Sequence, residues 1–373
     1  MILKKMGYYE YPNDDRYWEI KPFELGRINL LVAKNATGKT RTLKAVNCLG
    51  TMIKDNVFND HVNYDIEFVD NDNEDYQYLL SNDDKKIVFE KLIGNKKNLL
   101  QRNEIGKGNI YTKEFERNVE FQIPKNKLAI SRRDILQYPY LEKIHEWAES
   151  VRHYSFGSSM KQEYGSSEIS AIANNTYDNP VEMFITGERE SEREFSKGIL
   201  HSMNAIGYDL NIVDVKRGLY TNQNVRFDDY TLYAHEKDRN AIVTQNAMSQ
   251  GMFRALSILI HISYYAMLEI PTTVLIDDVG EGLDFDRSSK LINQLIELAE
   301  INESIQLIMS TNDRYVMNNV PLEYWQVIQR KGSECQVYNY QNSKEIFDEF
   351  TYTGLNNFDF LATDFINFQK ETK

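Results

Sequence analysis

An apolar run that ends in a turn of small residues, followed by a helix with one apolar face, constrains this chain more than any other feature. The run occupies residues 28–32, where four of the five side chains are Ile, Leu or Val. From Arg41 onward, apolar residues recur at helical spacing, at Leu43, Val46, Leu49 and Ile53, which predicts a helix with one buried face. A strand, a tight turn and a helix N-terminus direct several backbone N–H groups and the positive end of the helix dipole to one point. The segment therefore predicts a site for phosphate.

The turn also supplies the side chains that a nucleotide phosphate site requires. Lys39 is expected to reach the β- and γ-phosphates, and the Thr40 hydroxyl is expected to bind Mg²⁺. The strict form of such a loop has Gly where Ala33 stands, and Ala costs about 1–2 kcal/mol there only if its φ is positive. The predicted nucleotide contacts in the loop are Ala33, Lys34, Asn35, Ala36, Thr37, Gly38, Lys39, Thr40 and Arg41.

A second informative stretch begins about 210 residues after Lys39. Ser249, Gln250 and Gly251 form a Ser-x-Gly turn that opens a long apolar helix, and the apolar run 272–276 follows and ends in Asp277 and Asp278. A buried apolar strand would hold the Asp277 carboxylate rigidly at the edge of the sheet. Adjacent strand residues point to opposite faces, so we do not expect the two acids to share a proton.

Taken together, the loop, the Ser-x-Gly helix and the acidic strand end resemble the Walker A, signature and Walker B motifs of ABC-type ATPases of the SMC, RecF and OLD kind. The resemblance implies an α/β fold, a P-loop NTPase of the ABC-ATPase type, with a mixed sheet, an antiparallel N-terminal meander and a helical lobe. It implies ATP and Mg²⁺ as ligands, with Asp277 and Thr40 on the metal. It further implies that Ser249, Gln250 and Gly251 contact the nucleotide of a second subunit in an ATP-dependent homodimer.

Two positions depart from the pattern of these relatives. Asp278 stands where most of them have a glutamate that polarises the attacking water, and a misplacement of about one ångström can cost about 10²-fold in rate. Asn312 stands where a histidine usually senses the γ-phosphate, and an amide carries no positive charge. We therefore assign catalytic roles to Lys39, Asp278 and Asn312 and expect slow ATPase turnover. The Q-loop glutamine, a further metal contact, is not fixed by spacing, and Gln137 is its candidate.

The rest of the chain predicts one composite ATPase domain. Residues 1–130 are expected to form an N-terminal lobe with the Walker A motif, 131–245 a helical lobe or lid, and 246–373 a lobe with the signature and Walker B motifs. Strands are expected at 1–9, 17–23, 61–69, 76–80, 324–329 and 334–340. Tyr17 or Trp18 is a candidate for stacking on adenine, and packing within the sheet is the alternative. The aromatic C-terminal tail is read as a helix packed on the sheet, with a docking face as the alternative.

Composition limits the class of protein. The net charge of −13 argues against a broadly basic surface for nucleic acid, although local Lys and Arg clusters leave a nucleic-acid partner open. Two cysteines are too few for a disulfide framework. The N-terminus lacks the apolar core of a signal peptide, and no apolar run is long enough to span a membrane. We therefore expect a cytoplasmic protein without a membrane partner.

Compact bacterial heads of this type imply a function. The resemblance predicts an ATP-dependent dimer that gates a partner effector, a nuclease or a toxin, in antiphage defence or a toxin–antitoxin system. The sequence has no sustained heptad repeat for SMC arms, and about sixty residues after Ser310 leave no room for an OLD-type nuclease domain. Two alternatives stay open. One is a RecF-like DNA-repair ATPase that clamps nucleic acid. The other is a non-hydrolysing scaffold whose assembly is held together by bound nucleotide.

Overall fold

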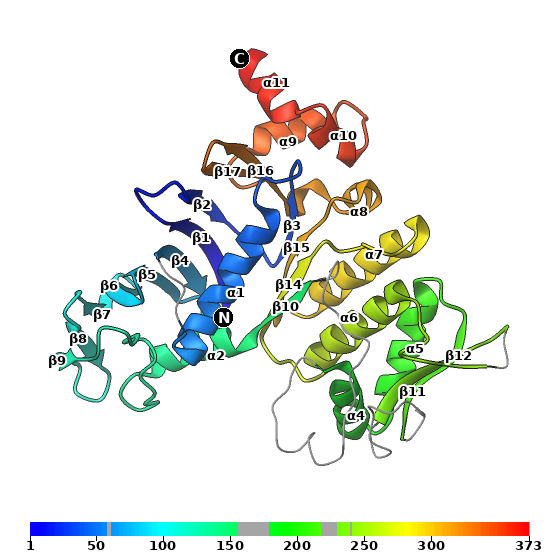
Figure 1. Cartoon of the computed structure of the whole chain (residues 1–373), viewed down its shortest axis with the longest axis horizontal. Coiled ribbons are helices and arrows are strands. Elements are labelled where there is room, and N and C mark those ends of the chain that lie inside the picture. The colour runs from blue at the N-terminus through cyan, green and yellow to red at the C-terminus, as the bar shows by residue number, and fades with distance from the viewer. Residues whose placement is uncertain (58–60, 156–178, 218–229, 239–240, 373) are drawn as a thin grey trace.

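The computed structural model describes residues 1–57, 61–155, 179–217, 230–238 and 241–372. Within these residues, one large sheet contains 14 strands in the order β10-β14-β15-β3-β16-β17-β2-β1-β4-β5-β6-β7-β8-β9 (Figure 1). The strands are β1 (Ile2–Glu10), β2 (Trp18–Glu24), β3 (Ile28–Val32), β4 (Val62–Val69), β5 (Asp75–Asp83), β6 (Lys86–Gly94), β7 (Lys97–Arg102), β8 (Lys107–Thr112), β9 (Arg117–Gln122), β10 (Val151–Ser155), β14 (Thr272–Asp277), β15 (Ile305–Ser310), β16 (Trp325–Lys331) and β17 (Glu334–Asn339).

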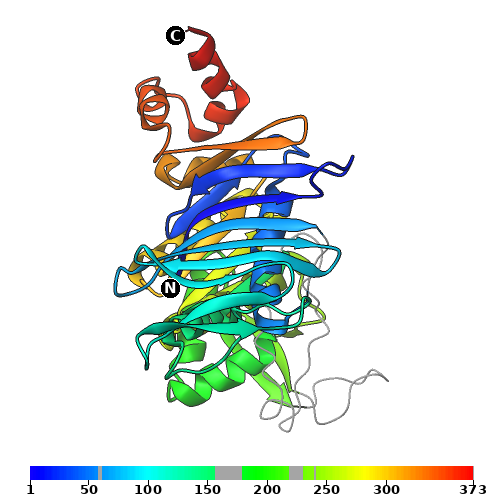
Figure 2. The same ribbon diagram turned by 90° about the vertical axis from the view of Figure 1, so that its left-hand side faces the viewer.

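The sheet is mixed, as the sequence predicts. Strands β10, β14, β15, β3 and β16 are parallel to one another, whereas β2, β1 and β4 to β9 form an antiparallel meander. The hairpin of β16 and β17 joins the two parts, because β17 pairs antiparallel with β16 and parallel with β2. Seen from the side, the meander strands follow one another as a continuous twisted layer (Figure 2). The predicted meander and hairpin strands are confirmed.

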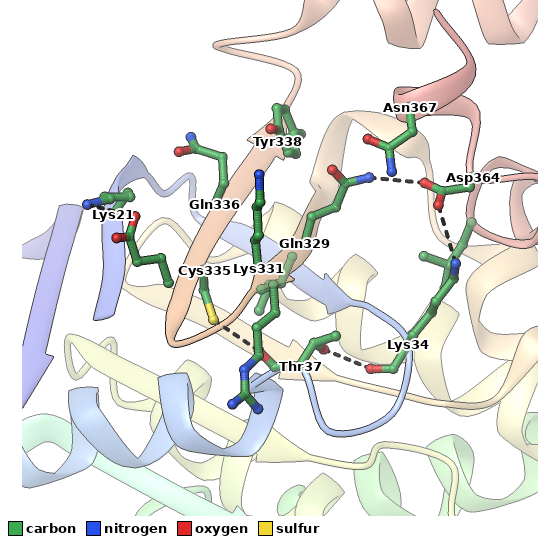
Figure 3. Close-up of a pocket in the computed structure, with 14 residues that line it drawn as sticks. Lys21, Lys34, Thr37, Gln329, Lys331, Cys335, Gln336, Tyr338, Asp364 and Asn367 are labelled. Carbon is green, nitrogen blue, oxygen red and sulfur yellow. Dashed lines mark hydrogen bonds and ion pairs between the residues drawn. The ribbon is translucent and has the colours of Figure 1, made fainter. Parts of the chain in front are cut away.

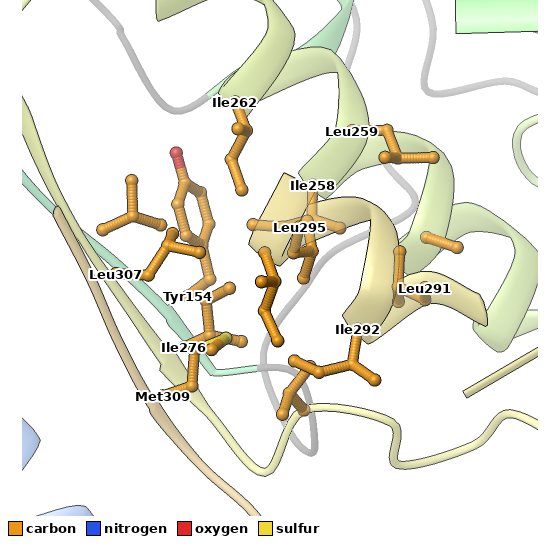
Figure 4. Packing of buried hydrophobic residues seen from close by; sticks show 14 of the residues in the cluster. Tyr154, Ile258, Leu259, Ile262, Ile276, Leu291, Ile292, Leu295, Leu307 and Met309 are labelled. Atoms are coloured by element: carbon orange, nitrogen blue, oxygen red, sulfur yellow. The ribbon is translucent and has the colours of Figure 1, made fainter. Parts of the chain in front are cut away.

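Helices cover the parallel part of the sheet on both faces, so β3 is buried at all five positions, the pattern of a central strand. Alternate β3 residues enter different cores. Leu31 packs in the core that contains α1 (Lys39–Asp55) and α2 (Pro139–Ser150). Leu30 packs in the core of α6 (Gln250–Met267) and α7 (Phe285–Ile301), part of which is shown in Figure 4.

The remaining described elements of the middle segment lie beyond α6. They are α4 (Pro180–Glu190), α5 (Phe195–Ala205) and the small antiparallel sheet of β11 (Leu210–Arg217), β12 (Tyr230–Glu236) and β13 (Ile242–Thr244). Their apolar side chains join the α6 core. By contrast, α2 packs on α1 and β10 pairs with β14, so this part of the predicted lobe belongs to the main sheet. The division at residues 130/131 and 245/246 stays a prediction.

The C-terminal tail forms three short helices instead of the single helix predicted: α9 (Lys344–Thr351), α10 (Asn357–Ala362) and α11 (Phe365–Thr372). They follow α8 (Arg314–Asn319) and the β16–β17 hairpin along the chain. Phe360 lies at the centre of their core, 4.7 Å from Phe347 and 5.0 Å from Phe350 between ring centroids. It also meets Trp325 of β16 edge-on, so the tail packs at the sheet, as predicted. Among the described residues, no helix has the length and apolar character needed to cross a bilayer.

Candidate functional site

The loop between β3 and α1 has the backbone of a phosphate cradle. Ala33 is not among the residues with positive φ, so Ala in place of Gly costs no strain at this position. Positive φ values occur instead at Ala36 (61°) and at Gly38 (114°), the residue that caps α1. Helix α1 begins at Lys39, two residues earlier than predicted, so its N-terminal N–H groups face the loop.

Trp18 forms the floor beneath Gly38. A Cβ atom at Gly38 would lie 2.7 Å from Cζ2 of Trp18, and the Trp18 side chain is only 1% exposed. The Arg41 guanidinium covers the Trp18 ring at 4.7 Å from its centroid. Of the two readings of Trp18, the structure shows packing within the sheet. The other aromatic candidate, Tyr17, donates its hydroxyl to Glu19 at 2.6 Å.

At one end of the site, helix α1 meets the ends of strands β14 and β15. The Thr40 hydroxyl donates to Oδ1 of Asp277 at 3.0 Å, and the Ser310 hydroxyl donates to the same oxygen at 2.6 Å. Asp277 is the last residue of β14 and Ser310 is the last residue of β15, and these strands are adjacent and parallel. Neighbouring parallel strands end at one edge of a sheet, so Ser310 meets Asp277 there although 33 positions separate them. Thr40, which lies 237 positions from Asp277, reaches the same edge from α1.

A second chain of hydrogen bonds links the three predicted catalytic residues. Nζ of Lys39 donates to Oδ1 of Asn312 at 2.7 Å, and Nδ2 of Asn312 donates to Oδ1 of Asp278 at 3.2 Å. Burial lowers the pKa of Lys39. Burial, and next the charge of Asp277, raise the pKa of Asp278. An acid whose pKa is raised holds a proton more strongly than usual, as a general base requires.

Asp278 departs from strand geometry. β14 ends at Asp277, and Asp278 has a φ of 55°, in the left-handed region, at a cost of roughly 1–2 kcal/mol. Asp278 therefore does not continue the strand, as the sequence prediction assumed, because the chain has turned before it. That the two acids do not share a proton stays a prediction. The two carboxylates have different hydrogen-bond partners: Thr40 and Ser310 for Asp277, and Asn312 for Asp278.

Lys39, Thr40, Asp278 and Asn312 border a cavity of about 510 Å³. Its lining residues are Trp18, Asn35, Ala36, Thr37, Gly38, Lys39, Thr40, Arg41, Lys44, Asp278, Asn312 and Arg330. The residues fit a nucleotide and Mg²⁺, because a glycine-capped helix N-terminus and four cationic side chains suit phosphate. The hydroxyl of Thr40 and the carboxylate of Asp277 are hard oxygen ligands, which Mg²⁺ prefers. Among the described residues, no cluster of three or more His, Cys, Asp and Glu offers a different metal site.

A larger cavity, about 570 Å³, lies on the other side of the phosphate loop (Figure 3). There the loop is tied to the C-terminal elements: Lys34 pairs with Asp364 at 3.3 Å, and Cys335 Sγ donates to the Thr37 carbonyl at 3.2 Å. Arg330 lines both cavities and donates to the carbonyl of Ala36 at 2.9 Å. The sequence reasoning missed Arg330, because its position near the end of β16 carries no local signal of contact with a loop 294 residues away.

The signature residues Ser249, Gln250 and Gly251 do not line the 510 Å³ cavity at the phosphate loop. Ser249 caps α6 by accepting a hydrogen bond from Met252 N at 3.2 Å, and both Ser249 and Gln250 are exposed. Gly251 packs against the turn before α7, where an added Cβ would lie 2.4 Å from the carbonyl oxygen of Gly282. Asp284 caps α7. The chain thus presents its Ser-x-Gly turn at the surface, apart from its own phosphate loop.

Gln137 is not brought to the predicted metal ligands either. It precedes α2, its backbone N–H donates to Asp134 at 2.9 Å, and its carbonyl accepts from Lys113 N at 2.9 Å. Lys113 follows β8, in the outer part of the antiparallel meander. The strand that pairs with β14 on the side away from β15 is β10, and Ser155 pairs with Asp277 in its register. Sequence spacing, which did not fix the Q-loop glutamine, could not anticipate this pairing.

The family and the fold both have known relatives. A family model described as "AAA domain, putative AbiEii toxin, Type IV TA system" matches residues 28–318. Among solved structures, the SMC head bound to the C-winged helix domain of ScpA has a TM-score of 0.52 at 13% identity, over 91% of this chain and 98% of that one. The Thermotoga maritima SMC head domain has a TM-score of 0.44 at 11% identity, over 91% and 99%. A search of curated proteins found no match.

Proposed function

This chain belongs to the family of AAA domains described as putative AbiEii toxins of type IV TA systems, and from that premise we propose that it binds ATP, dimerises around it and hydrolyses it. Its fold is that of an SMC-type ATPase head. The observation that carries the proposal is a pair of hydrogen-bond networks at one edge of the sheet. Thr40, Asp277 and Ser310 form one, and Lys39 and Asn312 with Asp278 form the other.

The hydrogen-bond network of Lys39, Asn312 and Asp278 supports a mechanism for γ-phosphate transfer to water. When the γ-phosphate enters, its oxygens replace the Asn312 amide oxygen as the acceptor for Lys39, so the Asn312 amide group is free to turn its N–H toward the phosphate. Asp278 orients the attacking water and accepts its proton. The water oxygen forms a bond to the γ-phosphorus, the bond to the bridging oxygen breaks, and ADP and inorganic phosphate leave. The short Asp278 side chain supports slow turnover.

The residues that would hold Mg²⁺ are Thr40 and Asp277. When bound, the metal neutralises charge that develops on the phosphate oxygens. Thr40 and Asp277 already share a hydrogen bond of 3.0 Å, so the ligands are in place before nucleotide arrives. Gln137 has no role in this proposal, because its contacts lie at the meander.

The exposed Ser249 turn supports the trans arrangement. A helix N-terminus with an exposed serine and a glycine two residues later is an anion site, and it does not line the cavity of its own chain. Two chains facing each other would bring Ser249, Gln250 and Gly251 of each onto the nucleotide of the other. The dimer would then bury two ATP molecules between its subunits.

Solution mass by light scattering tests this proposal, with and without Mg-ATP, on the wild type, Lys39→Ala and Ser249→Arg. We expect ATP to double the mass of the wild type and to leave both variants unchanged. Lys39→Ala removes the phosphate contact, whereas Ser249→Arg obstructs only the partner's nucleotide. Nucleotide binding by Ser249→Arg, measured by fluorescence, should therefore persist. A wild-type mass that ignores ATP while nucleotide still binds would refute dimerisation in trans.

The biological setting is a further part of the proposal. We infer that the cytoplasmic ATP-bound dimer gates an effector protein, a toxin or a nuclease, in defence against phage. The family description, which names a toxin–antitoxin context, supports this step. Co-expression with the genetically adjacent protein, with toxicity scored for wild type and Lys39→Ala, tests it. Equal toxicity from both would argue against gating by ATP.

A non-hydrolysing scaffold is the second candidate, and Asp278 together with Asn312 favours it. Both positions differ from the usual glutamate and histidine of relatives. Tight ATP binding, turnover near zero in the wild type and turnover restored in Asp278→Glu would establish the scaffold. Measurable wild-type turnover that Asp278→Glu does not raise would exclude it.

A further inference from the structure

A single buried hydroxyl connects the two acidic residues of the site. Ser310 is fully buried. Its Oγ donates to Oδ1 of Asp277 at 2.6 Å and accepts the backbone N–H of Asp278 at 3.0 Å. A serine hydroxyl has one donor and two acceptor lone pairs, so it makes both bonds at once. No other side chain of the described residues bonds to both of these acids.

The donated bond fixes the carboxylate of Asp277. Oδ1 accepts from both Ser310 and Thr40, and two donors on one oxygen determine the rotation of the group. The carboxylate is therefore held in one orientation before a metal would bind. Partners in this position typically govern metal affinity, because they set the orientation of the ligand.

The accepted bond fixes the backbone of Asp278. That residue is held at a φ of 55°, which non-glycine residues rarely adopt. Its backbone N–H donates to Oγ of Ser310, and the N–H of the next residue, Val279, donates to the carbonyl oxygen of Ser310 at 2.9 Å. Since these bonds hold the turn, they also determine where the Asp278 carboxylate lies relative to Asn312 and Lys39.

We propose that Ser310 is a positioning residue that couples the metal carboxylate, Asp277, to the water-activating acid, Asp278. The inference rests on the proposed ATPase function and extends it: one hydroxyl sets both the metal affinity and the placement of the base. Removal of the hydroxyl uncouples the two acids. Both then adopt other orientations although neither has been mutated.

The chain offers a matched control in the next residue. Thr311 is also fully buried. Its hydroxyl donates to the carbonyl of Val279 at 3.1 Å and accepts from Asp313 N at 3.0 Å. It thus ties the same turn to the same strand end without contact to either acid. Thr311→Val removes that hydroxyl and keeps the shape of the side chain.

The experiment compares Ser310→Ala, Ser310→Thr and Thr311→Val with the wild type. Affinity for a fluorescent ATP analogue is measured in EDTA and across a Mg²⁺ titration, and turnover is followed over the same titration. In EDTA we expect all four proteins to agree within about twofold, because the loop is intact. Ser310→Ala should require about tenfold more Mg²⁺ and lose about tenfold in kcat at saturating Mg²⁺. Ser310→Thr keeps the hydroxyl and should recover both within about threefold.

Two results would overturn the role of Ser310. One is a Ser310→Ala protein with the wild-type Mg²⁺ dependence and turnover. The other is a Thr311→Val protein with the same losses, which would mean that any buried hydroxyl of this turn serves equally. If Ser310→Ala does not fold, Ser310→Cys, a weak donor of similar shape, replaces it with the same expectation.

Failure of the ATPase proposal would be visible separately. A wild type that binds no nucleotide refutes the proposed function, and with it the role of Ser310. A wild type that binds nucleotide without turnover refutes hydrolysis alone. In that case the Mg²⁺-dependent gain in nucleotide affinity, compared between wild type and Ser310→Ala, still decides whether Ser310 positions Asp277.

Discussion

Gly38→Ala is the substitution whose cost follows most directly from the structure. Gly38 has a φ of 114°, and an added Cβ would lie 2.7 Å from Cζ2 of the buried Trp18. Left-handed backbone costs an L-residue about 1–2 kcal/mol. Overpacking against an immobile ring adds about 1–3 kcal/mol. The free energy of unfolding should therefore fall by roughly 2–5 kcal/mol.

Two other glycines separate these contributions. Gly332 has a φ of 62° and nothing within 4 Å of its added Cβ, so Gly332→Ala should cost only the backbone strain, about 1–2 kcal/mol. Gly198 lies within α5, has no positive φ and also has open space around it. Gly198→Ala should stabilise the protein by about 0.5–1 kcal/mol, since alanine favours the helix.

Urea unfolding of the four proteins without nucleotide, followed by tryptophan fluorescence, measures this series. From the most to the least stable, we expect the order Gly198→Ala, wild type, Gly332→Ala and Gly38→Ala. The reasoning is refuted if Gly38→Ala is no less stable than Gly332→Ala, because the contact with Trp18 would then contribute nothing. Gly38→Ala should also bind the ATP analogue more weakly, whereas Gly332→Ala should bind it normally.

Two further predictions concern the acid and the amide of the site. Because burial and Asp277 raise the pKa of Asp278, the charged carboxylate is disfavoured in the folded state at pH values above that pKa. Asp278→Asn should therefore raise the melting temperature of the nucleotide-free protein at pH 8, and the gain should vanish below the ordinary Asp pKa of about 3.9; an equal gain at both pH values would contradict this cause. In the wild type, the same raised pKa predicts that turnover is lost as the pH falls through it, at a higher pH than for an ordinary carboxyl. Asn312→Ala should lower kcat by about 10²-fold through loss of one donor to the phosphate, with nucleotide affinity within about threefold, and Asn312→His should restore turnover. Unchanged kcat in Asn312→Ala would remove the amide from the mechanism.

Local sequence pattern was sufficient to predict the elements that carry the site. The strand 28–32, the loop and α1 are adjacent in the chain, so their backbone groups converge without help from distant residues. The same is true of β14 with Asp277 at its end. Periodicity determines which residues are buried in such elements. The mixed α/β fold follows, and it is confirmed.

Contacts between distant segments were decided only by the tertiary structure. Trp18 lies under Gly38 because β2 and β3 belong to one sheet with β16 and β17 between them, an order that no local pattern specifies. Spacing did not fix the Q-loop glutamine, and the segment of its candidate, Gln137, is tied to Lys113 after β8.

The site itself shows the same division. The sequence determined that acidic and hydroxyl groups end buried strands, because apolar runs stop where polar residues begin. Only the parallel pairing of β14 and β15 brought the Ser310 hydroxyl to Asp277 and Asp278. Only the left-handed turn after β14 aimed Asp278 toward Asn312. Residue identity fixes which groups are available, whereas strand order and backbone conformation fix which of them meet.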